Sequence, residues 1–269
     1  MNDNTNNIIG FIIINEKDLN KDIRILNSYD QYRKENPGFA KEGYENNNAK
    51  EIQSICEIKI DDILIPFSFY HKFQGCGHHK IEYIFKDYLT NSSCLFYQCK
   101  NLSSLDLSHF NADHITNMTL MFAGCESLTN INFAGINTKK VRNMRHMFNG
   151  CESLKDLDLS NFRTDNVIDM VGMFERCISL TNLNLSNFNT QKVVSMVYMF
   201  CDCESLTDLD ISNFNTLNVE DSGDMLDGCY SLKNIRLKDT SPESQSMEFM
   251  LGINMYWPTI NSHLSNSNK

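Results

Sequence analysis

The chain has 269 residues, of which 41% are hydrophobic and 22% charged, and it contains only 4 Pro and 12 Gly. This composition excludes collagen-like, proline-rich and wholly disordered chains, and it suffices for a sizeable buried core. The 24 Lys and Arg against 34 Asp and Glu give a formal net charge of −10, which argues against nucleic acid as a partner because phosphate backbones are anionic. No run approaches 18 apolar residues, so we expect no membrane span.

Residues 1–88 contain no repeat and predict a small β-rich domain. Strands are expected at the apolar or alternating runs 8–14, 23–26, 56–60, 63–70 and 81–85, with a helix and a loop over residues 29–49. Asp61-Asp62 is expected to join two of these strands as a hairpin. The first seven residues contain no Lys or Arg and so lack the basic start of a secretory signal, from which we expect a cytoplasmic protein.

Cys76, His78 and His79 lie close together beside a glycine-containing turn. A structural zinc site uses four ligands in paired spacings such as C-x₂-C or H-x₃-H, and neither spacing occurs at these residues. We therefore interpret the segment as a hairpin turn with exposed imidazoles and expect no metal.

Six cysteines recur at intervals of 26 residues: Cys99, Cys125, Cys151, Cys177, Cys203 and Cys229. Aligning the chain on them gives a unit of the form C-x-S-L-x-x-L-x-L-S-x-F-x-T-x-x-V-x-x-M-x-x-M-F-x-x, with five whole copies between residues 99 and 227. The first part of the unit alternates as a strand does, and the second part has the three-residue apolar spacing of one buried face, which predicts a short helix or a 3₁₀ segment. Asn189 or Thr190 is expected to cap that helix in its unit. Such units bury their apolar columns by stacking on one another.

The cysteine column is expected to be a column of free, buried thiols. Cysteines in register on stacked units point the same way, whereas a disulfide needs Cβ atoms about 3.8 Å apart and converging. The thiols then serve as small core residues, in keeping with a reducing compartment.

The units, most clearly residues 154–177 and 180–203, resemble the BspA-like leucine-rich repeats of bacterial and protist proteins over about residues 89–237. The resemblance implies an α/β fold: a right-handed leucine-rich-repeat solenoid with a parallel strand wall, preceded by a small β-rich N-terminal capping domain. The expected domains are then residues 1–88, 89–237 and 238–269. The last is expected to contain a cap at residues 247–257 and a disordered tail from residue 262. Many members of the resembled family are surface or adhesion proteins, and the family carries no catalytic residues to transfer.

Two polar columns on the outward side of the predicted strands form the candidate binding surface. One column contains Asp106, Asn132, Asp158, Asn184, Asp210 and Arg236, and the other contains Ser104, Asn130, Asp156, Asn182, Asp208 and Asn234. Asn alternating with Asp separates carboxylates that would otherwise repel one another. The predicted partner-binding residues are Asp106, Asp156, Asp158, Asn182, Asn184, Asp208, Asp210 and Arg236, forming an acidic strip for a basic protein segment. The alternatives are a solvated wall without a ligand and a divalent cation between neighbouring carboxylates.

The chain contains no G-x-S-x-G elbow, no G-x-x-x-x-G-K-[ST] loop and no H-E-x-x-H motif. We therefore expect a non-enzymatic protein–protein interaction module, a leucine-rich-repeat scaffold that uses the outward strand face and needs no cofactor. A surface or adhesion protein and a structural subunit of a large assembly are the alternatives. The apolar pair Val197-Tyr198 is a second candidate contact, on the outer face. The sequence leaves the partner's identity and the oligomeric state open.

Overall fold

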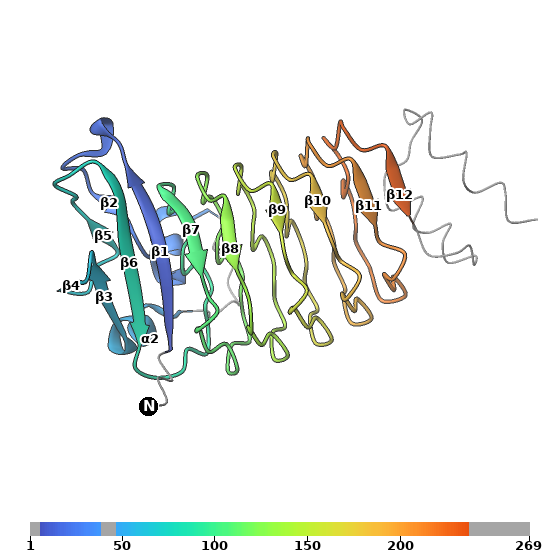
Figure 1. Cartoon of the computed structure of the whole chain (residues 1–269). Helices are drawn as coiled ribbons and strands as arrows, with labels where there is room; N and C mark the ends of the chain where they lie inside the picture. Colours follow the sequence, from blue (N-terminus) through green and yellow to red (C-terminus); the bar gives the residue numbers. More distant parts are fainter. Residues whose placement is uncertain (1–5, 39–46, 237–269) are drawn as a thin grey trace, which may run out of the picture.

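In the computed structural model, residues 6–38 and 47–236 are described (Figure 1). The elements that precede the repeats are β1 (Asn7–Ile14), the short 3₁₀ helix η1 (Glu16–Asp18), β2 (Ile23–Arg24), α1 (Tyr29–Glu35), α2 (Ala49–Ile55), β3 (Cys56–Ile60), β4 (Ile63–Ile65), β5 (Tyr70–His71) and β6 (Gly77–Phe85). The repeats contribute β7 (Leu102–Asp106), β8 (Asn130–Asn132), β9 (Asp156–Leu157), β10 (Asn182–Leu183), β11 (Asp208–Asp210) and β12 (Asn234–Arg236). Figure 1 shows the repeat units side by side, in a row that begins at the N-terminal sheet. The expected C-terminal cap and tail lie outside the described residues.

Strand β1 lies inside a six-stranded sheet with the order β4-β3-β6-β1-β7-β8. It pairs antiparallel with β6 on one side and antiparallel with β7, the first strand of the repeats, on the other. Its alternation buries Ile8, Ile12 and Ile14 in the core and leaves Phe11 42% exposed on the opposite face. The expected strand over residues 8–14 and the expected packing of the N-terminal region against the first unit are therefore confirmed.

The hairpin expected at Asp61-Asp62 is also confirmed. It joins β3 to β4, and the two residues have φ values of 50° and 65°, which a two-residue hairpin turn requires. The expected strand over residues 63–70 is too long, because β4 ends at Ile65. Pro66 follows directly and has no N–H to continue the ladder.

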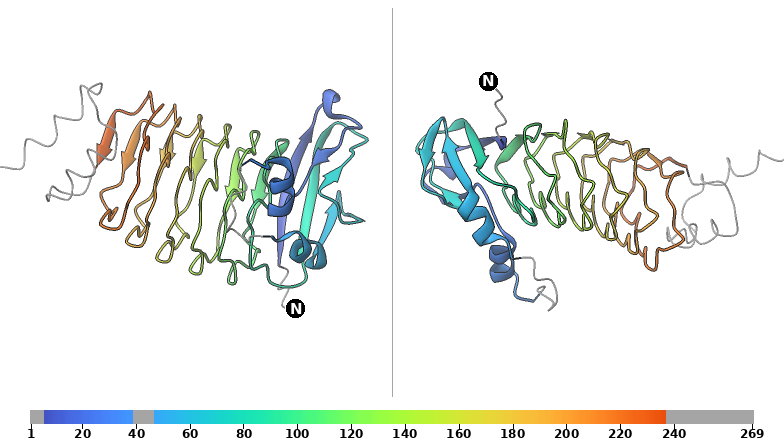
Figure 2. Two further views of the ribbon diagram at one scale, coloured as in Figure 1. Left: turned by 180° about the vertical axis from the view of Figure 1, so that it is seen from behind. Right: turned by 90° about the horizontal axis from the view of Figure 1, so that it is seen from below.

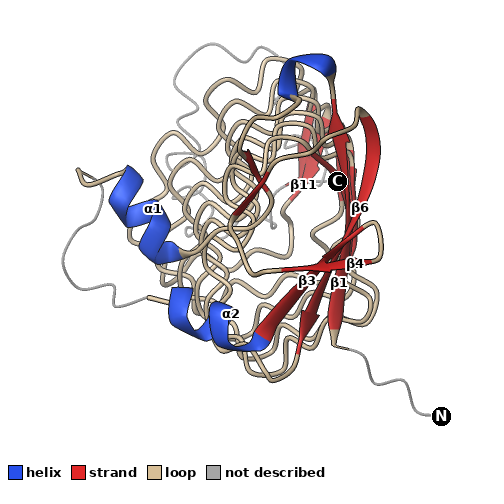
Figure 3. Cartoon of the chain, turned by 90° about the vertical axis from the view of Figure 1, so that its left-hand side faces the viewer, coloured by secondary structure: helices blue, strands red, loops and turns tan. Residues whose placement is uncertain are grey.

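Helix α2 is an element that the sequence analysis missed. The carboxylate of Asp30, in α1, accepts the backbone N–H groups of Asn48 and Ala49 at 2.9 and 2.8 Å, where α2 begins. A carboxylate at this end also complements the helix dipole. Viewed along the row, α1 lies across the molecule from β1 and β6 (Figure 3). The two short helices therefore cover a different side of the first units from the sheet.

The second half of each described unit is a series of tight turns, and the short helix or 3₁₀ segment predicted there is wrong. In the unit that contains Leu120, alternate N–H groups bond locally: Ala123 donates to the Leu120 carbonyl at 3.2 Å. The N–H groups between them donate to the next unit, as Phe122 does to the Met147 carbonyl at 2.9 Å. An α-helix would keep all of these bonds within one unit. The expected helix cap is consequently wrong too, because Thr190 bonds to the backbone of Asn215 in the next unit.

Two positions in every turn series have a left-handed backbone, which interrupts a helix made of L-residues. Their φ values lie between 52° and 73°. One column contains Cys94, Leu120, His146, Gly172, Tyr198 and Asp224, and the other contains Gln98, Gly124, Gly150, Arg176, Asp202 and Gly228. The three-residue apolar spacing of the sequence therefore comes from consecutive turns.

The expected α/β, leucine-rich-repeat right-handed solenoid is wrong. Among the described residues every helix precedes residue 56, so the repeats contribute no α layer. Their strands are two to five residues long and fall into separate sheets: β7 and β8 in the six-stranded sheet, β9 with β10, and β11 with β12. Over the described repeats there is thus no single parallel strand wall.

The units are held together mainly along the turns. Parallel bridges connect residues 91, 117, 143, 169, 195 and 221 in succession. At each junction four N–H groups of one turn series donate to carbonyls of the next, for example Leu120 to Arg145 at 2.9 Å. The units keep this side-by-side order in both views of Figure 2. The turn ladder, rather than a sheet, therefore sets the register of the polar columns.

The expected burial of the six repeat cysteines is confirmed. All six are buried and all are free thiols. Cys151 donates from Sγ to the Phe122 carbonyl of the preceding unit at 3.3 Å, and Cys229 does the same to Phe200 at 3.0 Å. Burial raises the pKa of both thiols to about 12. The column therefore consists of protonated sulfur groups that fill the core and tie neighbouring units together.

We expect Gly150→Ala to lower the free energy of unfolding by about 1 kcal/mol, because alanine must then adopt a left-handed backbone. Gly150 has φ of 69°, and the nearest atoms to an added Cβ are 3.7 Å away, so strain rather than a clash is tested. Urea denaturation followed by circular dichroism measures the loss. Gly75→Ala is the control, since nothing lies within 4 Å and its φ is not in the left-handed range. Equal stability of the two variants would contradict the turn assignment.

Candidate functional site

The predicted partner-binding residues lie on one outward face of the repeat strands, here called the strand face. Asp156, Asp158, Asn182, Asn184, Asp208, Asp210 and Arg236 are exposed, and Asp106 is partly buried. The strand residues between them, such as Leu157 and Leu209, point into the core. The structure therefore brings the predicted residues to one surface.

Strands that carry carboxylates alternate with strands that carry amides. β9 pairs in parallel with β10, which places Asn182 beside Asp156, and its Nδ2 donates to the carboxylate at 3.3 Å. The equivalent bond in β11 and β12 runs from Asn234 to Asp208 at 2.7 Å. One unit that carries amides thus lies between two units that carry carboxylates. The amide hydrogen bonds also hold the carboxylates in position.

Several strand-face side chains also form the turn that follows the strand. Oδ1 of Asp158 accepts the N–H of Ser160 at 2.9 Å, and Asp210 accepts that of Ser212 at 3.1 Å. Asn184 makes the same contact in its unit. This role is one that the sequence analysis missed, although an Asp or Asn two residues before Ser is typical of such turns. Asp and Asn are therefore interchangeable for the local structure.

The strand face is negatively charged at neutral pH. Hydrogen bonds from the backbone and side chain of Ser160 lower the pKa of Asp158 below 3.8. The amide of Asn234 lowers the pKa of Asp208, and the Ser212 side chain and N–H lower that of Asp210. Arg236 lies 3.5 Å from Asp210, but both are largely exposed, so this ion pair contributes little stability.

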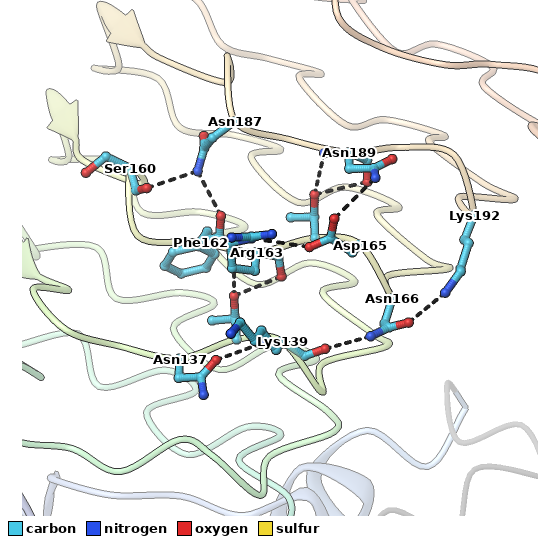
Figure 4. Close-up of polar contacts among 12 residues, drawn as sticks. Asn137, Lys139, Ser160, Phe162, Arg163, Asp165, Asn166, Asn187, Asn189 and Lys192 are labelled. Carbon is cyan, nitrogen blue, oxygen red and sulfur yellow. Dashed lines mark hydrogen bonds and ion pairs between the residues drawn. The ribbon is translucent and has the colours of Figure 1, made fainter.

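Polar side chains at the corner after each strand bond mainly to neighbouring units (Figure 4). Asn166 donates to the Lys139 carbonyl at 2.8 Å and accepts from Nζ of Lys192 at 2.7 Å. Nδ2 of Asn187 donates to the carbonyls of Ser160 and Phe162. These contacts span three successive units, so this corner stabilises the stack and leaves the strand face as the better candidate surface.

Only one residue of the second candidate contact, Val197-Tyr198, is as exposed as expected. Tyr198 is 40% exposed, whereas Val197 is partly buried. Ile168 and Val194, which were not predicted from the sequence, are 46% and 38% exposed and are adjacent through a backbone hydrogen bond of 2.9 Å. Each side chain occupies its own unit.

His78 and His79 lie in strand β6, so the expected turn with two exposed imidazoles is wrong for these residues. His78 is exposed, but Nδ1 of His79 lies 2.7 Å from Oδ2 of Asp61 and Nε2 lies 3.0 Å from the Gly75 carbonyl. Both ring nitrogens therefore face acceptors, which suits the doubly protonated imidazolium. Across the described residues no group of three or more His, Cys, Asp and Glu could hold a metal ion.

We expect the contribution of His79 to stability to fall as the pH rises. Burial alone would lower the pKa of His79, but its bonds to Asp61 and Gly75 outweigh burial and raise the pKa above 6.5. The pKa of Asp61 is below 3.8, because the bonds from His79 and Lys80 outweigh its burial. The pair therefore stabilises fully between about pH 4 and 6.5, and the histidine part is lost as the pH rises through the raised pKa.

Thermal unfolding of the wild type and of His79→Gln between pH 4 and 9 measures this contribution. The difference between the two midpoints should be largest near pH 5 and should shrink steadily above pH 6.5. A difference that does not change with pH would contradict the assignment.

A stack of 26-residue units with aligned polar columns on one exposed face defines the class of this molecule, a repeat protein. The chain belongs to the family described as "Mycoplasma protein of unknown function, DUF285", whose model matches residues 68–177 and 151–257. The resemblance to BspA-like leucine-rich repeats is thereby corrected. No curated protein and no solved structure matches the chain.

Within residues 6–38 and 47–236, no helix combines the length and the apolar character needed to cross a membrane.

Proposed function

We propose that the protein is a non-enzymatic protein-interaction module whose strand face binds a basic segment of a partner protein. The observation that supports this best is the set of exposed carboxylates at Asp156, Asp158, Asp208 and Asp210, each held in place by hydrogen bonds from its neighbours. A preformed acidic surface loses little conformational freedom when it binds a cationic segment, and it also attracts that segment from a distance.

The spacing of the carboxylates defines the partner segment more closely. Parallel bridges join successive units along the turns and hold them about 4.8 Å apart, so the Asp pairs of units two apart lie about 10 Å from one another. A polyproline II helix has three residues per turn and advances about 3.1 Å per residue, so residues three apart share a face and lie about 9 Å from one another. The favoured partner is a segment in this extended helical conformation with Lys or Arg at every third position.

A reducing, cytoplasmic location is part of the proposal. It is supported by the ten cysteines, all of which are free, because a reducing compartment prevents disulfides from forming between them before the fold buries most of them. The adhesion alternative rested on the BspA resemblance and is not retained.

Fluorescence anisotropy with two labelled peptides tests the proposal. One peptide carries Lys at every third position, and the other has the same composition with its Lys residues consecutive. We expect the wild type to bind the first peptide more tightly, and binding to weaken as salt rises. The fourfold variant Asp156→Asn, Asp158→Asn, Asp208→Asn, Asp210→Asn should bind at least about tenfold more weakly.

The asparagine variant keeps the turns intact, because Asn132 and Asn184 make the same turn contacts in the wild type. A matched control removes four charges elsewhere, through Asp113→Asn, Asp165→Asn, Glu220→Gln and Asp224→Asn. Unchanged binding by the strand-face variant would refute the location. Equal weakening by both variants would mean that net charge alone attracts the peptide.

A further inference from the structure

The corner that follows the repeat strands carries a group of cations, here called the basic corner. It consists of Lys139, Lys140, Arg142 and Lys192, and all four residues are exposed. The ion pairs among the described residues involve none of these four side chains. Residues 133–151, which contain the first three, include no Asp or Glu, although the chain has a net charge of −10. The basic corner is therefore a local positive surface, separate from the strand face.

The acidic residues beside the basic corner already have other partners. Asp113 and Asp165 occupy the positions equivalent to Lys139 in the two adjoining units. Nδ2 of Asn137 donates to Asp113 at 2.6 Å, and Nε of Arg163 donates to Asp165 at 3.3 Å. The cations of the basic corner are therefore available to carboxylates outside the molecule.

The basic corner and the strand face repeat with the same spacing. Lys140 and Lys192 are equivalent residues two 26-residue units apart. Nζ of Lys192 donates to Oδ1 of Asn166, the equivalent residue in the unit between them, at 2.7 Å (Figure 4). Asp156 and Asp208 on the strand face are likewise two units apart, with an asparagine between them. The turn ladder sets both spacings at about 10 Å, so a row of cations matches a row of carboxylates.

The two matching rows do not pair within one molecule. Among residues 6–38 and 47–236, no ion pair joins the basic corner to the strand face. Each row is a column of equivalent residues, so both run along the stack of units, whose order Figure 1 shows. Two copies that lie side by side with their stacks aligned would place the basic corner of one against the strand face of the other.

We propose that the basic corner binds the strand face of a second copy of this chain, with Lys140 and Lys192 facing carboxylates two units apart. This inference rests on the proposed function, because it uses the same strand face as the receiving surface. A row of cations on a folded stack loses less conformational freedom on binding than a flexible segment does. The contact is heterologous, so each copy keeps one free surface of each kind and side-by-side chains of copies form.

The net negative charge of both copies does not prevent this contact at physiological salt. The Debye length is then about 8 Å, so distant charges are screened while oppositely charged groups in contact still attract one another. Exposed ion pairs are individually weak, and the contact therefore forms at high protein concentration. A nucleic acid carries one phosphate about every 3.4 Å along each strand, and the acidic remainder of the chain repels this denser charge.

Carbodiimide crosslinking of the full chain, which joins Lys amines directly to carboxylates, tests the contact. Mass spectrometry of an equal mixture of isotope-labelled and unlabelled protein identifies the crosslinks that join two copies. We expect these to connect Lys140 or Lys192 to the strand-face carboxylates, and high salt to reduce their yield at least tenfold. Absence of such crosslinks, or an even spread over all exposed lysines, overturns the inference.

Two variants test whether the surfaces are complementary. The corner variant carries Lys139→Gln, Lys140→Gln, Arg142→Gln and Lys192→Gln, and the second is the fourfold strand-face variant described above. We expect each alone to associate at least tenfold more weakly than the wild type in sedimentation velocity. An equal mixture of the two should form dimers, because one retains the strand face and the other retains the basic corner. A mixture that stays monomeric overturns the inference.

A matched control removes four exposed lysines of the N-terminal region, through Lys17→Gln, Lys21→Gln, Lys34→Gln and Lys50→Gln. It changes the net charge by the same amount as the corner variant and should associate as the wild type does. Equal weakening in the control and in the corner variant would show that net charge, rather than the basic corner, governs association.

Peptide binding separates this inference from the proposed function. The corner variant should bind the peptide with Lys at every third position as the wild type does, because its strand face is intact. Peptide binding without association of copies overturns this inference alone, whereas loss of both in the wild type overturns both. A single-stranded oligonucleotide that binds the wild type more tightly than a second copy does, and fails to bind the corner variant, would identify a nucleic acid as the occupant and overturn the inference as well.

Discussion

We expect Phe148→Ala to lower the free energy of unfolding by about 3–5 kcal/mol. Phe148 is fully buried, and its ring stacks between Phe122 at 5.5 Å and Phe174 at 5.7 Å, with interplanar angles of 12° and 3°. Its removal leaves a cavity that borders two unit junctions at once, and the backbone ladders on both sides resist collapse into it. Urea denaturation followed by circular dichroism measures the loss.

Two variants separate packing from other effects at this site. Phe148→Leu retains most of the volume and should cost less, about 1–1.5 kcal/mol. Phe11→Ala removes a ring that is 42% exposed on the outward face of β1, and it should change stability by about 0.5 kcal/mol. If Phe148→Ala costs no more than Phe11→Ala, the aromatic stack does not carry the stability assigned to it.

The sequence was sufficient to predict the period of the units and the identity of their buried columns. A 26-residue recurrence places Phe122, Phe148 and Phe174 at equivalent positions, and all three are fully buried. The burial of Cys151 follows from the same reasoning, because a small apolar side chain in register on stacked units has no other environment. Residues at equivalent positions of the 26-residue unit therefore share the same burial.

The sequence did not distinguish a helix from a series of turns, because both place apolar residues three apart. The distinguishing signal was glycine. Gly124, Gly150 and Gly228 share one column, and each has a positive φ. Gly172 lies in the other left-handed column, in which Leu120 occupies the equivalent position two units earlier. Non-glycine residues in both columns hid this signal, since the inter-unit bonds hold them in a conformation that they otherwise avoid.

The candidate surface could be predicted in part. Strand alternation placed Asp156, Asn182 and Asp208 on the outward side, where the structure also has them. The pocket lined by Arg24, Glu35, Tyr70 and Lys100 could not be predicted, because these residues come from unrelated segments. Their juxtaposition depends on how the N-terminal region packs against the first unit, about which neither periodicity nor spacing carries information.

We expect Thr164→Val to lower the free energy of unfolding by about 2 kcal/mol, although it changes the side-chain volume little. The hydroxyl of Thr164 is buried and makes two bonds to one residue of the next unit: it accepts the Asn189 N–H at 2.7 Å and donates to the Asn189 carbonyl at 3.0 Å. Valine leaves both backbone groups of Asn189 without this partner at a partly buried junction. Thr138 and Thr190 make the same pair of bonds in their units.

Thr181→Val is the matched control, because this partly exposed hydroxyl makes longer bonds: it donates to the Lys155 carbonyl at 3.3 Å and accepts from Nδ2 of Asn182 at 3.5 Å. It should cost no more than about 0.5 kcal/mol. Thr138 and Thr190 lie two units apart, so the losses from Thr138→Val and Thr190→Val should add in the double variant. Equal losses of unfolding free energy in Thr164→Val and Thr181→Val would show that the buried threonine hydroxyls do not stabilise the junctions between units. The register of the strand face would then depend on the turn ladder alone.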